Sequence, residues 1–151
     1  MTKIYKTGRV VIVLNGRFAG KKALMVKNYE DGNRIRKYPH CLVVGLKQTG
    51  RKVTRRMSEK MIKRKSKINV FVKYLNHSHF VPTRYRVTDL DFKDILKEDH
   101  LEEAKRDRKK AIEMKTRIRE MIQSKYQNLP EDKGIEDKTG HIRYFFKKFR
   151  F

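Results

Sequence analysis

The sequence has little cysteine, few acidic residues and no long apolar run, and each scarcity excludes a class of protein. Cys41 is the one cysteine among 151 residues, so the chain can form neither an internal disulfide nor a multi-cysteine zinc site. The longest aliphatic run covers residues 10–14, which is too short for a membrane-spanning helix or for the apolar part of a secretory signal. We therefore expect neither a membrane span nor a disulfide-stabilised secreted domain.

The scarcity of acidic residues points to a polyanionic partner. Forty lysine and arginine residues stand against seventeen aspartate and glutamate residues, which gives a formal net charge of +23 and a pI of about 10.3. Repulsion of this size opposes a compact free state, and a bound polyanion relieves it. Nucleic acid is the first candidate partner and an anionic membrane is the second.

The positive charge is concentrated toward the two ends of the chain. Residues 1–88 hold twenty-three basic residues and three acidic ones, a net charge of +20. Residues 89–140 hold thirteen basic and fourteen acidic residues, a net charge of −1, while residues 141–151 hold four basic residues and no acid. We expect residues 1–88 and the C-terminal end to bind the polyanion, and the region between them to pack or to contact protein.

Short β-branched segments between turn-forming residues predict a β domain over residues 1–88. Hydrophobic residues make up 38% of the chain, which is enough for a small core. Short runs flanked by glycine, asparagine or aspartate favour strands over helices, and several such strands suggest an open barrel or a sandwich. Ser58 is the expected N-cap of one or two helical turns. The expected strands cover residues 8–14, 23–29, 41–46, 52–54, 70–75 and 85–87, and the helical turns cover residues 58–66.

Residues 89–151 are predicted to form a helical extension with an aromatic and basic tail. No glycine or proline occurs in residues 99–126, and apolar side chains recur there at helical spacing. This helix should end before Pro130, and residues 129–140 are predicted to form a polar linker. The expected fold class is therefore mainly β, with an α-helical C-terminal extension.

The densest basic run covers residues 51–67, with nine basic residues and one acid, Glu59, in seventeen positions. Cations at this density neutralise phosphates and release counterions, which drives binding without sequence preference. A merely solubilising surface needs far less charge. This run is therefore the main predicted nucleic-acid contact.

A second candidate contact is formed by Lys21 and Lys22, which follow Gly16 and Gly20 between two expected strands. Glycine lets backbone amides approach a phosphate closely, but a plain hairpin loop explains these residues equally well. The segment is not a nucleotide-binding P-loop, because the Gly-Lys-Ser/Thr ending is absent. Gly16 and Gly20 are predicted to be structural turn residues.

The C-terminal stretch, residues 141–151, alternates aromatic and basic side chains. Its rings can stack on bases while its cations meet phosphates, or the rings can dock into protein. Both can hold if the stretch is a strand, because alternate side chains of a strand face opposite ways.

Catalytic and metal sites have little support in the sequence. His40, Cys41, His77 and His79 have weak spacing for zinc, and the histidines are expected to contact RNA or to fill the core. The acidic cluster within residues 89–99 is a conceivable magnesium site, but a helix N-terminus or pairing with the basic half explains it better. We predict no enzyme activity, no cofactor and no metal.

Residues 7–26 resemble the KOW motif, which is two strands around a basic, glycine-containing loop on the SH3-like barrels of ribosomal and transcription-elongation proteins. Residues 51–54, the run of residues 66–85 and the C-terminus are similar to the eukaryotic large-subunit ribosomal protein twenty-seven family. That family ends in Trp-Phe-Phe, one further residue and Lys-Leu-Arg-Phe. This chain departs from it at Tyr144 for tryptophan, at Phe149 for leucine and at Ile142 for asparagine, and also over residues 89–139.

The resemblance implies a structural component of the cytoplasmic large ribosomal subunit on a small SH3-like β-barrel, with passage through the nucleus or nucleolus during assembly. It implies that the barrel loops and the basic run bind ribosomal RNA, and that the extension and tail contact neighbouring ribosomal proteins. The alternative is a KOW-containing transcription-elongation or chromatin adaptor, although such barrels usually lie among other domains. The residues expected to bind rRNA are Lys3, Lys6, Arg17, Lys21, Lys22, Arg51, Lys52, Arg55, Arg56, Lys60, Lys63, Arg64, Lys65, Lys67, Lys73, Arg84, Arg143, Lys147, Lys148 and Arg150.

Overall fold

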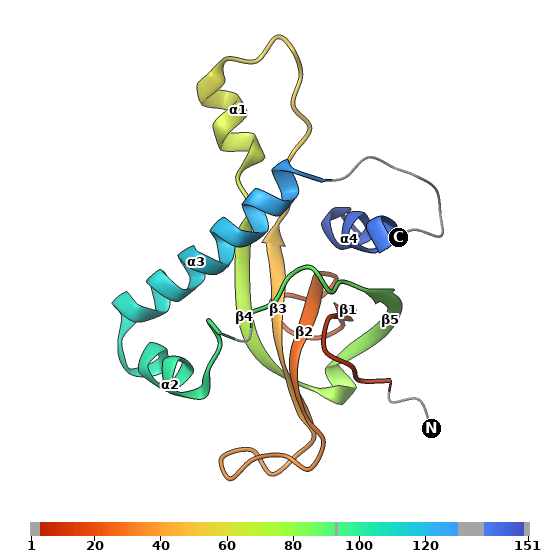
Figure 1. Cartoon of the computed structure of the whole chain (residues 1–151), viewed down its shortest axis with the longest axis vertical. Helices are drawn as coiled ribbons and strands as arrows, with labels where there is room; N and C mark the ends of the chain where they lie inside the picture. The colour runs from red at the N-terminus through yellow and green to blue at the C-terminus, as the bar shows by residue number, and fades with distance from the viewer. Residues whose placement is uncertain (1–3, 93, 130–137, 150–151) are drawn as a thin grey trace.

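The fold is an antiparallel sheet with helix α1 inserted between two of its strands and further helices in the C-terminal part, as Figure 1 shows for the computed structural model, which describes residues 4–92, 94–129 and 138–149. The mainly β fold with a helical C-terminal part is confirmed. In chain order the elements are β1 (Arg9–Val13), β2 (Lys22–Tyr29), β3 (His40–Gln48), α1 (Glu59–Ser66), β4 (Asn69–Asn76), the short 3-10 helix η1 (His77–His79), β5 (Phe80–Arg86), α2 (Glu98–Arg106), α3 (Arg108–Gln127) and α4 (Lys138–Phe146).

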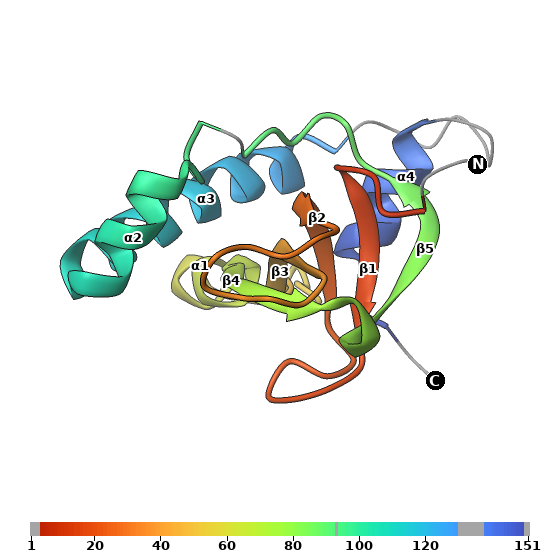
Figure 2. The same cartoon turned by 90° about the horizontal axis from the view of Figure 1, so that it is seen from below.

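The five strands are hydrogen-bonded in the order β4-β3-β2-β1-β5, and every neighbouring pair is antiparallel. The order starts at β4 and ends at β5, so the sheet is open and not a closed barrel. It curves strongly, as the view in Figure 2 shows, and η1 makes the turn between the two edge strands. The predicted barrel is thus realised as a curved, open sheet.

Both faces of the central strands are buried, which explains why β2 and β3 are nearly continuous apolar runs. On one face, Leu24 and Val44 belong to a core that includes residues from α2, α3 and α4. On the other face, Met25 and Val43 pack in a second core inside the curve of the sheet. Phe18 closes that second core from the β1–β2 loop, its ring centroid 4.0 Å from that of Phe71.

Two of the strand predictions are not matched by the structure: one strand is absent and another starts earlier than expected. The strand predicted over residues 52–54 is absent: these residues lie exposed between β3 and α1 and pair with no strand of the described sheet. Strand β5 starts at Phe80, well before residue 85. Its Pro82, which lacks a backbone N–H, is tolerated because β5 lies at the edge of the sheet.

The helical turns predicted over residues 58–66 are confirmed as α1. Ser58 occupies the N-cap position, but its side chain makes no capping hydrogen bond. Its backbone carbonyl accepts the first helical hydrogen bond, from the Ile62 amide at 3.0 Å. Ser58 therefore caps α1 through its backbone carbonyl and not through its side chain.

The single helix predicted over residues 99–126 is two helices, α2 and α3, separated at Asp107. Asp107 has extended backbone angles, and aspartate favours caps over helix interiors. The bend lets Leu101 of α2 and both Ile118 and Ile122 of α3 reach the core. No helix among the described residues is both long and apolar enough to cross a bilayer.

The strand alternative for the C-terminal stretch is wrong, because residues 138–146 form α4. Ile142, Phe145 and Phe146 share one side of this helix and are buried in the core. Residues 138–140, expected in a linker, belong to α4, and residues 130–137 lie outside the described part of the chain.

Candidate nucleic-acid interface

A basic hollow of about 510 Å³ brings together three segments that are far apart in the sequence. They are the start of β2, the end of β3 with the residues after it, and the residues that follow α4. Six exposed or half-buried cations line the hollow, together with polar and apolar groups and no acidic residue. Those cations are Lys21, Lys47, Arg51, Lys52, Lys147 and Lys148.

The first wall is the β1–β2 turn. Gly16 and Gly20 both have positive φ, 85° and 71°, so both predicted turn glycines occupy a conformation that other residues rarely adopt. The Gly20 amide donates to the Val13 carbonyl at 2.7 Å, and the Val13 amide donates to the Lys21 carbonyl at 2.9 Å. The turn therefore fixes Lys21 at the rim of the hollow.

The second wall is the segment between β3 and α1. The Arg51 amide donates to the Lys65 carbonyl at 2.9 Å, which ties the start of this segment to the end of α1. The end of α1 is in turn fastened to α3, because the Gln123 side chain accepts from the Ile68 amide at 3.1 Å and donates to the Ser66 carbonyl at 3.2 Å. Arg51 and Lys52 are thus exposed cations, and the backbone at Arg51 is fixed by its hydrogen bond to the end of α1.

The third wall follows α4. Because Phe145 and Phe146 anchor this helix in the core, the exposed Lys147 and Lys148 emerge beside the other two walls. The tail rings therefore serve different purposes: Phe145 and Phe146 face protein, whereas Phe149 is half-buried at the hollow.

No cation of the hollow is neutralised by an ion pair in the described part of the chain. The two salt bridges found there, Lys27–Glu98 at 3.6 Å and Lys110–Glu103 at 3.0 Å, lie elsewhere. Clustered like charges repel one another, and a bound polyanion removes that cost. The hollow is chemically suited to phosphate groups.

Lys22 differs from the other predicted contacts, because it points into the protein. Its side chain is only 5% exposed. Its Nζ donates to the Tyr144 carbonyl at 2.6 Å and to the Lys147 carbonyl at 2.8 Å. Burial, followed by the nearby charge of Lys147, lowers the pKa of Lys22 to about 8. The sequence does not distinguish Lys21 from Lys22, but the structure does, because Lys21 is half-buried and Lys22 is buried with its ammonium on two carbonyls.

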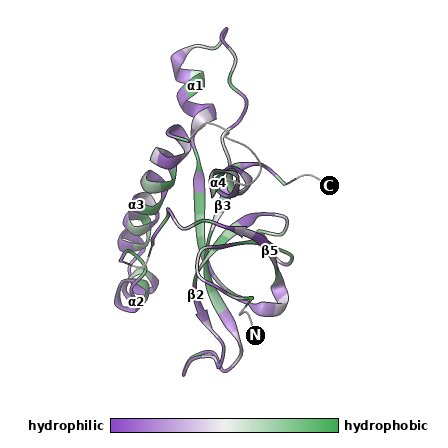
Figure 3. Cartoon of the chain, turned by 45° about the vertical axis from the view of Figure 1, so that its right-hand side comes forward, coloured by the Kyte–Doolittle hydropathy of each residue, from purple (hydrophilic) through white to green (hydrophobic). Residues whose placement is uncertain are grey.

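The basic helix α1 and the loop before it project away from the sheet, at the top of Figure 1. This projection is predominantly hydrophilic in Figure 3. A second hollow, of about 520 Å³, lies between α1 and α3, and Lys63, Lys67 and Arg119 are among its lining residues. All the cations predicted on this projection are exposed except Lys65, which is half-buried; they are Arg55, Arg56, Lys60, Lys63, Arg64, Lys65 and Lys67.

The remaining predicted contacts are dispersed over other surfaces. The exposed Arg17 and Arg84 lie over the rings of the residues that follow them, 5.0 Å from the Phe18 centroid and 5.3 Å from the Tyr85 centroid. Lys6 and Lys73 are also exposed, while Arg143 on α4 is half-buried. Lys3 and Arg150 lie outside the described residues.

The sequence interpretation missed two sets of cations. Lys47 at the end of β3 completes the hollow. Arg34 and Lys37 are exposed on the long β2–β3 hairpin, where Ile35 is 71% exposed, and this hairpin projects at the bottom of Figure 1. The turn-forming residues 30–33 followed by three basic residues were the available signal for this hairpin.

Two of the histidines considered for zinc, His40 and His77, pack against aromatic rings, whereas His79 is exposed. His40 is buried, stacks on Tyr29 at 4.8 Å and places Nδ1 2.8 Å from the Tyr38 carbonyl. His77 stacks on Tyr5 at 4.2 Å. Cys41 is buried, and burial raises the pKa of its thiol to about 12. Within the described ranges, no three histidine, cysteine or acidic side chains gather as a metal site.

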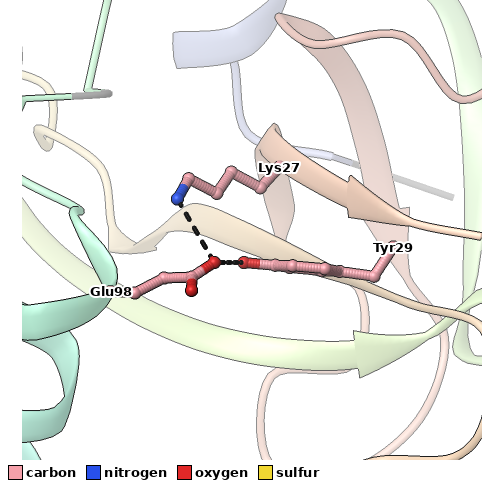
Figure 4. Close-up of polar contacts among 3 residues, drawn as sticks. All are labelled: Lys27, Tyr29 and Glu98. Carbon is pink, nitrogen blue, oxygen red and sulfur yellow. Dashed lines mark hydrogen bonds and ion pairs between the residues drawn. The ribbon is translucent and has the colours of Figure 1, made fainter. Parts of the chain in front are cut away.

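The acidic cluster pairs with the sheet through Glu98, which lies in the first turn of α2. Its Oε1 accepts from the Tyr29 hydroxyl at 3.0 Å and lies 3.6 Å from the Lys27 ammonium (Figure 4). Burial, and then the hydrogen bond to Glu98, raises the pKa of Tyr29. Glu98 therefore joins the helical extension to β2, in agreement with the expected pairing of the cluster with the basic half.

Comparison with known proteins gives a match over nearly the whole chain. The sequence model of the Ribosomal L27e protein family matches residues 10–151. The chain is 42% identical over 153 residues to the large ribosomal subunit protein eL27 of Tetrahymena thermophila, and 42% identical over 151 residues to that of Pyrobotrys stellatus. It is 39% identical over 153 residues to that of Pisum sativum. Each of these matches covers 100% of both chains.

Proposed function

The chain belongs to the Ribosomal L27e protein family, and from this premise we propose that it is a structural, non-enzymatic constituent of the large ribosomal subunit. In this role it binds folded ribosomal RNA and neighbouring ribosomal proteins in the cytoplasm, after assembly in the nucleolus. As a structural component of the ribosome it contributes to translation.

The observation that carries this proposal is the basic hollow, in which Lys21, Arg51 and Lys147 converge from distant segments without an acidic neighbour. Lysine and arginine meet phosphates, and the released counterions drive association. Because the three walls are held by backbone hydrogen bonds and core packing, the cations present a fixed shape. A fixed arrangement selects folded RNA whose phosphates match it, by shape and not by base sequence.

The projecting helix α1 and the β2–β3 hairpin extend this contact in opposite directions (Figure 1). Both carry exposed cations, so each can reach RNA beyond the sheet. Helices α2 and α3 belong to the charge-balanced region, and α3 exposes 55% of Ile112. We assign this part of the surface to neighbouring ribosomal proteins.

The experiment is sedimentation of a native lysate through a sucrose gradient, before and after a wash at about 0.5 M salt, where surface electrostatic contacts are strongly weakened. An integral component stays with the large subunit and polysomes in both gradients. A chain that remains at the top of the gradient, or that the wash removes completely, contradicts the proposal.

A further inference from the structure

The buried lysine of β2 fastens the C-terminal helix to the sheet. The Lys22 ammonium donates to the carbonyls of Tyr144 and Lys147, at 2.6 and 2.8 Å. It also lies 3.6 Å from the centre of the Tyr144 ring. One side chain therefore donates to two carbonyls and contacts one aromatic face. The two hydrogen bonds join residues that are 122 and 125 positions apart in the sequence.

The two carbonyls that Lys22 binds lie at the C-terminal end of α4. Helix α4 ends at Phe146, and the last carbonyls of a helix have no intrahelical donor. They also form the negative end of the helix dipole, where a lysine is favourable. Lys22 supplies both the missing donor and the positive charge.

Aromatic contacts also hold α4 against β5, an edge strand of the sheet. The Tyr144 ring stacks on Tyr85 of β5, with centroids 3.8 Å apart and an interplanar angle of 19°. His141 meets the edge of the Tyr85 ring, and its Nδ1 lies 2.9 Å from the Arg86 carbonyl. Helix α4 is thus held by these contacts in addition to its buried phenylalanines.

The placement of the third wall of the hollow depends on this fastening. Lys147 and Lys148 lie at and directly after the carbonyls that Lys22 binds, and they line the same hollow as Lys21 and Arg51. Moving the end of α4 would move these two cations relative to the other walls. Lys22 itself also borders the hollow, but its ammonium is directed to protein acceptors.

We propose that Lys22 is a positioning residue that assembles the hollow into a composite site for RNA phosphates and does not itself bind RNA. Lys21, Arg51 and Lys147 are the direct phosphate contacts of this site. The RNA part of this inference rests on the proposed function, whereas the fastening of α4 by Lys22 can be tested in the free protein.

The first test compares K22M with K21M, because both variants remove one ammonium at adjacent positions. Amide hydrogen exchange of the free chain reports whether α4 is held. We expect K22M to speed exchange of the amides of residues 144–149 by about tenfold or more, and K21M to leave them unchanged. Unchanged exchange in K22M overturns the proposal.

The second test needs no variant, so it also decides the matter if K22M does not fold. The wild-type chain is treated with an amine-acetylating reagent, with and without a folded fragment of large-subunit rRNA, and each lysine is followed by mass spectrometry. We expect Lys22 to react much more slowly than Lys21 in both samples, and the RNA to protect Lys21 and Lys147. If Lys22 is acetylated rapidly in the free chain and RNA slows that reaction, Lys22 contacts RNA directly and the proposal is overturned. If RNA protects none of these lysines from acetylation, the proposed function is contradicted. The hydrogen-exchange measurement on K22M then still shows whether Lys22 holds α4 in place.

Discussion

The backbone of Gly50 lies directly against the ring of Tyr126. A Cβ at position 50 would be 2.6 Å from the Tyr126 hydroxyl and 3.0 Å from the ring carbon that bears it. Another neighbour of the ring is Phe146, at 5.2 Å between centroids. Tyr126 of α3 therefore connects the segment after β3 with α4, and these are two of the three walls of the basic hollow.

We expect the Gly50→Ala substitution to destabilise the chain by about 1–3 kcal/mol, because the added methyl forces Tyr126 or the backbone to move. Urea unfolding followed by circular dichroism measures this change. Tyr126→Leu provides the matched comparison, since it vacates the space that the methyl would occupy. In the double variant the Gly50→Ala cost should largely disappear, and strict additivity of the two substitutions would contradict the close approach of Gly50 to Tyr126.

The combined replacement of Arg51, Lys52, Arg55 and Arg56 by alanine is expected to weaken RNA binding and to flatten its salt dependence. Each phosphate that the variant no longer neutralises reduces the slope of log affinity against log salt by about 0.7–0.9, so four lost contacts reduce it by up to about 2.8–3.6. Fluorescence anisotropy with a large-subunit rRNA fragment, over a series of salt concentrations, measures the slope.

The matched control for this replacement is alanine at Arg108, Lys109, Lys115 and Arg117, which are four exposed cations of α3. It removes the same charge from the region assigned to protein contacts, so the salt slope should change little. If the two quadruple variants reduce the slope equally, net charge and not the basic segment governs binding.

The pKa of Tyr29 makes a prediction about alkaline pH. Burial and the hydrogen bond to Glu98 raise this pKa in the folded chain, whereas an unfolded tyrosine titrates near about 10. The unfolded state therefore loses its proton first. The stability linked to Tyr29 is fully present below about pH 10 and is lost as the pH rises through the folded pKa.

Glu98→Gln keeps an acceptor for the Tyr29 hydroxyl but removes the negative charge. We expect the Tyr29 pKa to fall while remaining above that of a free tyrosine, because burial is the larger cause of the shift. Ultraviolet absorbance titration of the phenolate measures it, with Tyr29→Phe identifying the signal. An unchanged titration in the Gln variant would show that Glu98 does not hold this hydroxyl.

Two tail phenylalanines should respond differently to truncation. Phe145 is fully buried in the core, so Phe145→Ala is expected to cost about 3–5 kcal/mol of folding stability. Phe149 is half-buried at the hollow, and Phe149→Ala should cost clearly less. Thermal unfolding of the two variants provides the comparison, and equal losses would contradict the different burial of the two rings.

Local sequence preferences are enough to locate most of the secondary structure and the regions where charge accumulates. Strand propensity and turn residues located β1 to β4, because these preferences act within a few residues. The charge count located the basic regions, because composition requires no fold. The residues of the KOW-like loop and of the C-terminus pointed to the family that the full-length comparison establishes.

Which cations come together in the hollow depends on the tertiary fold. Lys21 and Lys22 are adjacent in sequence and both border the hollow, yet only Lys22 is buried with its ammonium on the carbonyls at the end of α4, whereas Lys21 is half-buried. Lys47 enters the hollow because β3 ends beside the C-terminal wall. Phe145 and Phe146 of α4 face inward because the neighbouring core is apolar. The alternation of aromatic and basic residues in the sequence does not show which side chains face that core. Burial is set by contacts between distant segments, and those contacts exist only once the chain has folded.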